Sequence, residues 1–283
     1  MQTMWNRREV LGSAAGALFG GVLAQPLGAA TGAAAKTTRF SLGIQSYSLR
    51  GYEVDDALKH AHALGIKTLE LFSKHLPLAA SNQQIAELRG KVSGLGMKLL
   101  SHGVDSFTKD HAANRRIFEM AHKAGIRNIT CDPSEDSFDS LDKLVAEFKI
   151  RVAIHNHGPG ARYDKLSDVL TAIRGRNELI GACADLGHFI RSAEDPVRVI
   201  HLLRGRLYGV HLKDFRDRDK RMRGVLLGRG HLDVEGVFRA LAEVNFPQDA
   251  CLAIEYEEKP ADPIDDIRQC VAIATAAAEK AAH

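Results

Sequence analysis

Apolar and polar residues alternate along residues 37–283 in two patterns that follow each other regularly. Short runs rich in Val, Ile, Leu and Phe are typical of buried β-strands, and the longer stretches between them have the period of an amphipathic helix. The predicted strands are Phe40–Tyr47, Thr68–Phe72, Lys98–His102, Asn128–Cys131, Arg151–Asn156, Ile180–Asp185, Leu207–Lys213 and Ala250–Glu255. The predicted helices are Val54–Leu64, Asn82–Gly94, Asp110–Ala124, Phe138–Phe148, Leu166–Arg174, Asp195–Leu203, Val234–Glu243 and Asp262–Ala282.

This succession predicts an α/β protein of the (β/α)8 TIM barrel class. Gly65, Gly96 and Gly125 each stand between a predicted helix and the next strand, where glycine commonly ends a helix. Such a barrel needs about 250 residues, which residues 37–283 supply. No linker divides this region, so we predict one domain. The active site of such barrels lies at the C-terminal ends of the strands.

Residues 1–36 do not follow the barrel pattern. Arg7 and Arg8 precede an apolar, Ala- and Gly-rich stretch, Leu11–Leu27, and more Ala-rich sequence follows it. This order is typical of a twin-arginine signal peptide with its cleavage region. The stretch is short for a membrane span and contains Pro26, so we expect no permanent anchor. We therefore expect the twin-arginine export machinery as a partner and the periplasm as the location.

The composition excludes some classes of partner. The chain is 45% hydrophobic and 26% charged, as is ordinary for a globular protein with a sizeable core. A formal net charge of +3 with dispersed Lys and Arg does not indicate a nucleic-acid partner. Cys131, Cys183, Cys251 and Cys270 form no Cys-x-x-Cys pair, and three of them fall in predicted strands. We expect all four to be unpaired core residues.

Metal-capable side chains gather where four of the predicted strands end. The runs are Ile154-His155-Asn156-His157, Asp185-Leu186-Gly187-His188, His211-Leu212-Lys213-Asp214 and Ile254-Glu255-Tyr256-Glu257. Neighbouring strands that end alike deliver these side chains to one shared point of the barrel rim. Buried polar groups are costly unless they are satisfied together, and a cation satisfies them together. The pattern therefore predicts a divalent-metal centre.

Together with Leu227-Gly228-Arg229-Gly230, these runs resemble the motifs of the xylose isomerase-like barrel superfamily, in its sugar phosphate isomerase/epimerase branch. The resemblance covers Thr37–His283 and implies four metal ligands: His155, Asp185, His211 and Glu255. Family members commonly have Glu on strand five, where this chain has His155. Two imidazoles suit Mn, Co, Zn or Fe better than Mg. His157 shares a strand face with His155, so either histidine fits as the strand-five ligand.

The resemblance implies a metal-dependent sugar isomerase or epimerase. The metal would polarise a carbonyl and its neighbouring hydroxyl, so that a proton beside the carbonyl can leave and an enediolate can form. Glu255 is the first candidate for the base that takes this proton, and Glu70 is the second. Lys213 is expected to stabilise the developing negative charge, and His188 to hold a hydroxyl or shuttle a proton.

The expected partner is a small carbohydrate, whose hydroxyls His102, His157 and Lys213 would bind. An unphosphorylated sugar fits the periplasm better than a sugar phosphate. Elimination from the same intermediate gives an alternative, a 3-keto-glycoside lyase or hydratase. A DNA-repair enzyme like endonuclease IV belongs to the same superfamily, but residues 219–223 lack the Asp-x-His that its extra metal ions need. A barrel that only binds sugar is disfavoured because all four expected ligands are present.

Overall fold

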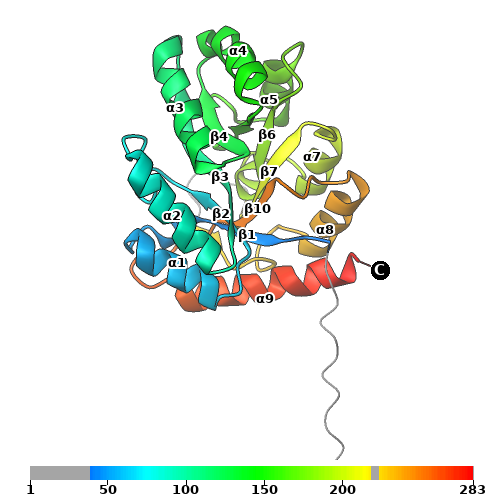
Figure 1. Cartoon of the computed structure of the whole chain (residues 1–283). Coiled ribbons are helices and arrows are strands. Elements are labelled where there is room, and N and C mark those ends of the chain that lie inside the picture. The colour runs from blue at the N-terminus through cyan, green and yellow to red at the C-terminus, as the bar shows by residue number, and fades with distance from the viewer. Residues whose placement is uncertain (1–38, 218–222, 283) are drawn as a thin grey trace, which may run out of the picture. The chain divides into compact units, whose positions relative to one another are not determined.

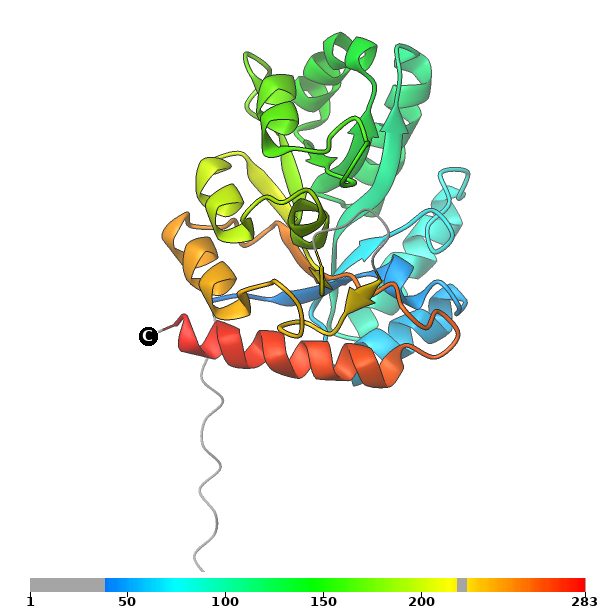
Figure 2. The same cartoon turned by 180° about the vertical axis from the view of Figure 1, so that it is seen from behind.

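Residues Lys36–His283 form one compact unit, and a computed structural model describes residues 39–217 and 223–282. The predicted signal peptide and residues 219–222 of the loop discussed above lie outside this part. Eight parallel strands close into a barrel in the order β1-β10-β7-β6-β5-β4-β3-β2. The helices surround the barrel on the outside, and α9 lies beside α8 (Figures 1 and 2). The predicted (β/α)8 TIM barrel is thereby confirmed.

The elements follow the predicted order. The barrel strands are β1 Leu42–Gln45, β2 Thr68–Leu71, β3 Lys98–Phe107, β4 Asn128–Pro133, β5 Arg151–His155, β6 Ile180–Asp185, β7 Leu207–Leu212 and β10 Cys251–Ile254. The helices are α1 Val54–Ala63, α2 Asn82–Gly94, α3 His111–Ala124, α4 Phe138–Phe148, α5 Leu166–Ile173, α6 Leu186–Arg191, α7 Pro196–Leu202, α8 Val234–Glu243 and α9 Ile264–Lys280. Short 3-10 helices occupy Ser46–Leu49 and Glu135–Ser137.

Local chemistry explains where the elements begin and end. All residues of β6 and β7 are buried, as expected for strands covered on both faces. Ser81 and Gln84 form a reciprocal capping box at the start of α2. Gly125 ends α3 with a left-handed φ of 72°, which costs a glycine little. Gly65 and Gly96 also have positive φ, at 80° and 68°, as the predicted helix ends require.

The structure differs from the predicted elements mainly at the rim. β3 does not stop at His102 but continues to Phe107, which places His102 in mid-strand. A short helix, α6, directly follows β6, and a small antiparallel hairpin joins β8 Asp214–Phe215 to β9 Gly224–Val225. The expected first strand ends early, because a 3-10 turn takes over at Ser46. These rim elements shape the site.

Strand register aligns the predicted ligands. In the pairing of β6 with β7, Asp185 stands directly beside His211. In the pairing of β7 with β10, Ala253 stands beside His211, two residues before Glu255. His155 stands beside Cys183, two residues before Asp185. The four side chains therefore start from adjacent strands at nearly one level of the barrel.

One further prediction concerns the described part of the chain. Its four cysteines are buried and form no disulfide, as expected. No helix there has the length and apolar character needed to cross a bilayer.

Candidate metal centre and active site

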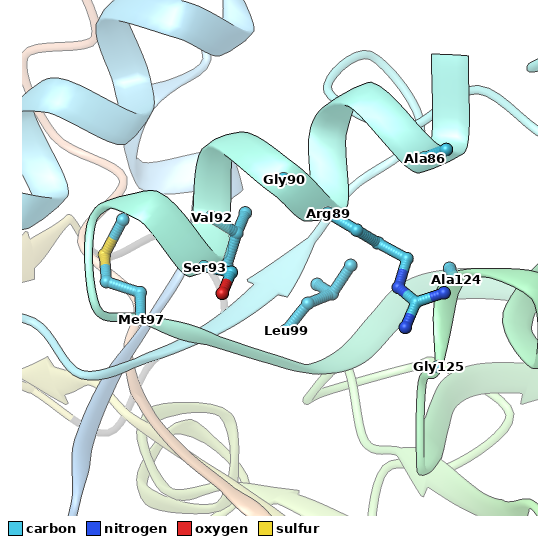
Figure 3. A pocket seen from close by; sticks show the side chains of 9 residues that line it. All are labelled: Ala86, Arg89, Gly90, Val92, Ser93, Met97, Leu99, Ala124 and Gly125. Carbon is cyan, nitrogen blue, oxygen red and sulfur yellow. The ribbon is translucent and has the colours of Figure 1, made fainter. Parts of the chain in front are cut away.

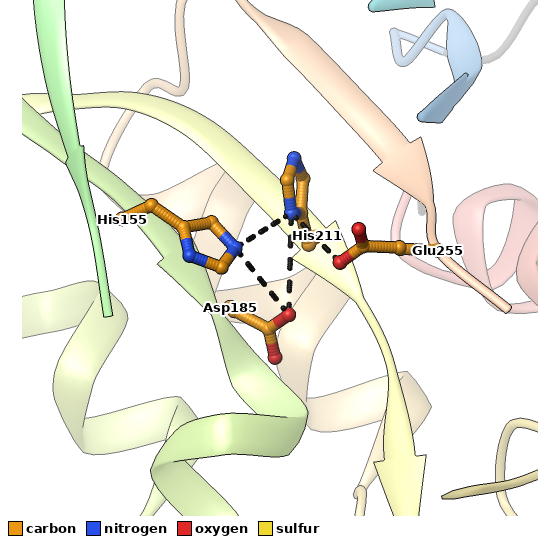
Figure 4. Close-up of side chains that lie close together, drawn as sticks. All are labelled: His155, Asp185, His211 and Glu255. Atoms are coloured by element: carbon orange, nitrogen blue, oxygen red, sulfur yellow. Dashed lines mark hydrogen bonds and ion pairs between the residues drawn. The ribbon is translucent and has the colours of Figure 1, made fainter. Parts of the chain in front are cut away.

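Four predicted side chains converge at the C-terminal end of the barrel (Figure 4). His155 Nε2 lies 3.1 Å from His211 Nδ1 and 3.6 Å from Asp185 Oδ2. His211 Nδ1 lies 3.1 Å from Glu255 Oε2 and 4.0 Å from Asp185 Oδ2. All four donor atoms lie within 4.8 Å of one another, and all four residues are buried. The structure thus joins His155, and not His157, to the other three residues.

The donor set fits a divalent cation. Atoms that bind one ion at about 2.0–2.2 Å lie roughly 3–4.4 Å from each other, and the four distances given above fall in this range. Asp185 Oδ2 and Glu255 Oε2 are buried, and their neighbours at the shared point are the imidazoles of the site and the Lys213 ammonium. Two imidazoles and two carboxylates suit Mn, Co, Zn or Fe. His155, Asp185, His211 and Glu255 are therefore the residues that would hold the metal.

The two carboxylate oxygens of Asp185 have different roles. Its Oδ1 accepts the backbone N–H of His188 at 2.7 Å and so caps α6, which leaves Oδ2 for the shared point. Asn156 fixes the backbone of Asp185 from the neighbouring strand. The Asn156 Nδ2 donates to the Asp185 carbonyl at 3.0 Å, and its Oδ1 accepts the Asp185 N–H at 2.9 Å. This two-point contact sets the position of β5 against β6 at the site.

Glu70 holds His211 from inside the barrel. Its Oε1 lies 3.1 Å from His211 Nε2 and accepts a hydrogen bond from Gln45 Nε2 at 2.8 Å. Glu70 is fully buried and is not among the residues that line the cavity above the site. The expectation that Glu70 is a second candidate base does not fit this placement, because no substrate proton reaches it. A carboxylate on the second nitrogen of a ligating histidine orients that ring.

Lys213 lies beside the metal-capable oxygens. Its Nζ is 3.0 Å from Asp185 Oδ2, 2.8 Å from Glu255 Oε2 and 2.5 Å from Glu257 Oε1. Gly187 makes room for its stem, since a Cβ there would lie 2.7 Å from Lys213 Cγ. Glu257 gives the ammonium a partner other than the ligand oxygens.

Burial and neighbouring charges set the protonation of the site. Burial would lower the pKa of Lys213, but the carboxylates of Asp185, Glu255 and Glu257 raise it well above its usual value. Burial would raise the pKa of Asp185, but its electrostatic interactions with the His188 ring and the Lys213 ammonium hold that pKa well below its usual value. Burial lowers the pKa of His157 to about 4 and that of His188 to about 3. Both of these imidazoles are thus neutral at neutral pH.

A cavity of about 420 Å³ reaches two of the four ligands, His155 and Glu255, and its volume is within the usual range for small-molecule sites. His157, His188 and Lys213 line it, as predicted for groups that meet a substrate, and so does Glu255. Volume alone does not mark a site. A cavity of about 440 Å³ between α2 and α3 has Arg89 as its one charged lining residue (Figure 3). It lies at the opposite end of the barrel, beside the start of β3.

His102 does not reach the cavity, contrary to expectation. Its Nδ1 pairs with Asp105 Oδ2 at 2.7 Å, and its Nε2 contacts the Leu76 carbonyl at 2.9 Å. The side chain is fully buried, so neither nitrogen is available to a substrate. The cause is the longer course of β3, which moves the rim five residues beyond His102. The structure assigns His102 a structural partner in place of a ligand.

Sequence reasoning did not select several residues that build the site. Asn156 and Glu257 have the roles described above, and Tyr47, Phe72 and Val104 line the cavity. The sequence does indicate a place for Glu257 in the site, because it follows Glu255 by two residues and so points to the same side of an extended chain. The sequence does not mark Tyr47 and Phe72 as site residues, because aromatic residues at strand ends usually pack in the core.

The described residues thus form a TIM barrel with a candidate divalent-metal centre at the C-terminal ends of its strands. Residues 58–273 match the family described as "Xylose isomerase-like TIM barrel", and the chain belongs to this family.

Similar proteins include an inosose dehydratase of Clostridium botulinum, which is 30% identical over 145 residues, 45% of this chain and 48% of that one. The chain spans about half the length of the curated relatives it matches first. A crystal structure of a protein from Parabacteroides distasonis is 28% identical, covers 83% of this chain and 97% of its own, and has a TM-score of 0.65. A 3-keto-D-glucoside 4-epimerase from E. coli, at 18% identity, shares the fold: it covers 83% of this chain and 98% of its own, with a TM-score of 0.64.

Proposed function

We propose that the protein is a metal-dependent enzyme that removes a proton next to the carbonyl group of a carbohydrate, as a sugar isomerase or epimerase does. The observation that carries this proposal is the position of four convergent metal donors beneath a cavity lined by acid–base side chains. Bound there, a divalent cation would act as a Lewis acid toward the carbonyl oxygen and its neighbouring hydroxyl. The family match supports this class of chemistry.

The side chains of the cavity divide the chemical work. Glu255 lines the cavity and belongs to the donor set, and it takes the proton. Lys213 carries a positive charge beside Glu255 and stabilises the negative charge that develops on the substrate oxygen. His157 and His188 face the same cavity as neutral imidazoles and can hold hydroxyl groups or return a proton.

A dehydratase is the second candidate function. Elimination begins with the same proton abstraction but ends with the loss of a β-hydroxyl, which needs an acid. His157 and His188 line the same cavity as Glu255 and can supply this acid. The named activity of the similar Clostridium botulinum protein, an inosose dehydratase, also favours elimination.

One experiment separates these outcomes. The purified protein is analysed for bound metal and then incubated with ketoses, inososes and 3-keto-glycosides in deuterated water, with NMR detection. We expect deuterium at the carbon beside the carbonyl, together with an isomer, an epimer or a dehydrated product. Chelator-treated protein is the matched control and should show no exchange. Exchange that is independent of metal, or metal-loaded protein without exchange on any compound, would contradict the proposal.

We further propose that the protein is exported to the periplasm through the twin-arginine machinery. Arg7 and Arg8 precede a weakly apolar stretch, which is the arrangement that this machinery reads. Changing both residues to Lys should leave the precursor in the cytoplasm, as cell fractionation would reveal. Normal periplasmic delivery of the double variant would refute this proposal.

A further inference from the structure

The cavity above the metal donors has two chemically different halves. One half comes from the ends of β5, β6, β7 and β10, and every residue in it is ionisable: His155, His157, His188, Lys213, Glu255 and Glu257. The other half comes from the ends of β1 and β2 and from the middle of β3, and no residue in it is charged: Gln45, Tyr47, Phe72, Ser73, Gly103 and Val104. The proposed chemistry uses only the first half, so the second half must serve another purpose.

The uncharged half presents apolar groups to the solvent. Tyr47 is 39% exposed and Val104 is 38% exposed. They are two of only four large hydrophobic residues that are exposed in the described part of the chain. Two such residues at the mouth of one cavity are unusual, since exposed apolar groups gathered in a cleft commonly mark a binding surface. Together with Phe72 they form what we call the apolar lip.

Tyr47 is held in a fixed orientation. Its ring meets the ring of Phe72 edge to face, with the centroids 5.3 Å apart and the planes at 87°. The guanidinium of Arg50 lies 4.6 Å from the centroid of the Tyr47 ring, and Arg50 donates hydrogen bonds to the carbonyls of Tyr47 and Glu257. A ring fixed in this way presents a flat surface at little entropic cost.

We infer that the substrate is an uncharged, ring-form carbohydrate derivative of the glycoside class, whose ring or aglycone packs on the apolar lip. This inference rests on the proposed function, because the carbonyl end must lie over the metal donors. A pyranose ring has faces of C–H groups that pack against aromatic surfaces, whereas an extended open-chain sugar exposes hydroxyls along its whole length. Apolar lining with a few polar groups is typical of sites that bind such a face.

Charge supports the same class of substrate. A phosphate or carboxylate on the non-reacting end would lie in a half-cavity whose lining residues include no cation. Burying an anion without a partner is expensive. Lys213, in the other half, already contacts three carboxylates. Ser73 offers a neutral hydroxyl, which suits the hydroxyl groups of a sugar.

A binding experiment tests the inference without turnover. Calorimetric titration of metal-loaded protein compares phenyl β-D-glucopyranoside with D-glucitol, which has the same carbon count as the sugar but no ring. We expect the glycoside to bind at least tenfold more tightly. Tyr47→Ala should weaken glycoside binding about tenfold, the order expected for the loss of one aromatic packing contact. Leu202→Ala, which removes an equally exposed apolar residue on α7 (49% exposed), is the matched control and should have no effect.

Equal binding of the two probes, no binding of either, or unchanged binding by Tyr47→Ala would overturn the inference. A second measurement separates it from the proposed function. Deuterium exchange is followed with methyl 3-keto-β-D-glucopyranoside and with D-erythrulose, a ketose too short to close a furanose or pyranose ring. Exchange on the glycoside, with a KM raised about tenfold and kcat nearly unchanged in Tyr47→Ala, supports the inference. Exchange on the open-chain ketose alone overturns the inference but leaves the proposed function standing, and exchange on neither compound refutes the proposed function.

Discussion

His211 has a partner on each of its ring nitrogens. Its Nδ1 faces His155 and Glu255, while Glu70 holds its Nε2 at 3.1 Å. A histidine that binds a metal commonly has its second nitrogen held in this way, which fixes both the tautomer and the direction of the ring. At this scale the site depends on one imidazole and on the buried carboxylate behind it.

Replacing His211 by Ala should therefore remove most of the bound metal while the barrel remains folded. Glu70→Gln keeps the shape of the side chain but removes its charge, and should weaken metal binding about 10–100-fold. Elemental analysis gives the metal content, and circular dichroism checks the fold. His201→Ala, at a half-exposed histidine on α7, serves as the control. Full metal occupancy in His211→Ala would contradict the assignment of the centre.

Lys213 invites a prediction about catalysis. In Lys213→Ala we expect the metal to remain bound and kcat to fall on the order of 10²–10³, the range for losing one charge-stabilising donor. Glu257→Gln removes one contact of the ammonium and should have a smaller effect on kcat. If kcat of the metal-loaded Lys213→Ala protein stays within a few-fold of the parent, Lys213 only shapes the cavity through its ion pairs. Steady-state kinetics with the substrate found by deuterium exchange provide the measurement.

At the scale of elements, the sequence predicts the barrel because the apolar runs of the strands and the helical period between them are both clear. The helices also have recognisable capping residues. The four convergent donors follow from the same pattern, since parallel strands bring their C-terminal ends to one rim. The choice between His155 and His157 does not follow from it. Both point to one side of the strand, and only the three-dimensional position of β5 against β6, fixed by Asn156, separates them.

Short rim elements are the part that the sequence did not predict. α6 has six residues, and β8 and β9 have two each, which is too short for a period to emerge. β3 carried no clear signal of its continuation past His102, because Val104, Asp105, Ser106 and Phe107 do not alternate between apolar and polar residues. That continuation makes His102 a buried partner of Asp105.

His102→Gln should therefore destabilise the fold by about 1–3 kcal/mol without changing KM. Burial would lower the pKa of His102, but its hydrogen bond to Asp105 raises it above the ordinary value. A raised pKa in the folded state means that the contribution is fully present below about pH 6.5 and declines as the pH rises through the folded pKa. Urea unfolding at pH 6 and pH 9 checks this dependence. A larger loss at pH 9 would contradict it.

At the scale of the whole molecule, the barrel must place several acidic groups in its interior. Asp185 and Glu255 are buried close to each other, and Lys213 contacts both within 3.0 Å. An unpaired buried charge is strongly destabilising, whereas a paired one costs far less. The ammonium therefore supplies an internal counter-charge to the same oxygens that a metal would use.

Chelator-treated protein should accordingly remain folded and lose only part of its stability. Lys213→Met keeps most of the stem volume but removes the charge, so its chelator-treated form should be less stable than the treated parent by about 3–5 kcal/mol. With metal present, the variant and the parent should differ much less. Denaturant unfolding of all four samples gives the comparison. Equal stability of the two treated proteins would disprove the compensating role of Lys213.

A barrel with an internal counter-charge can finish folding before it meets an ion. Folding of the barrel and binding of the metal are then two separate steps. The ion would enter late, through the mouth of the cavity, and could be exchanged there. Which metal the protein carries would accordingly reflect the supply around the finished barrel, and not the conditions in which the chain was synthesised.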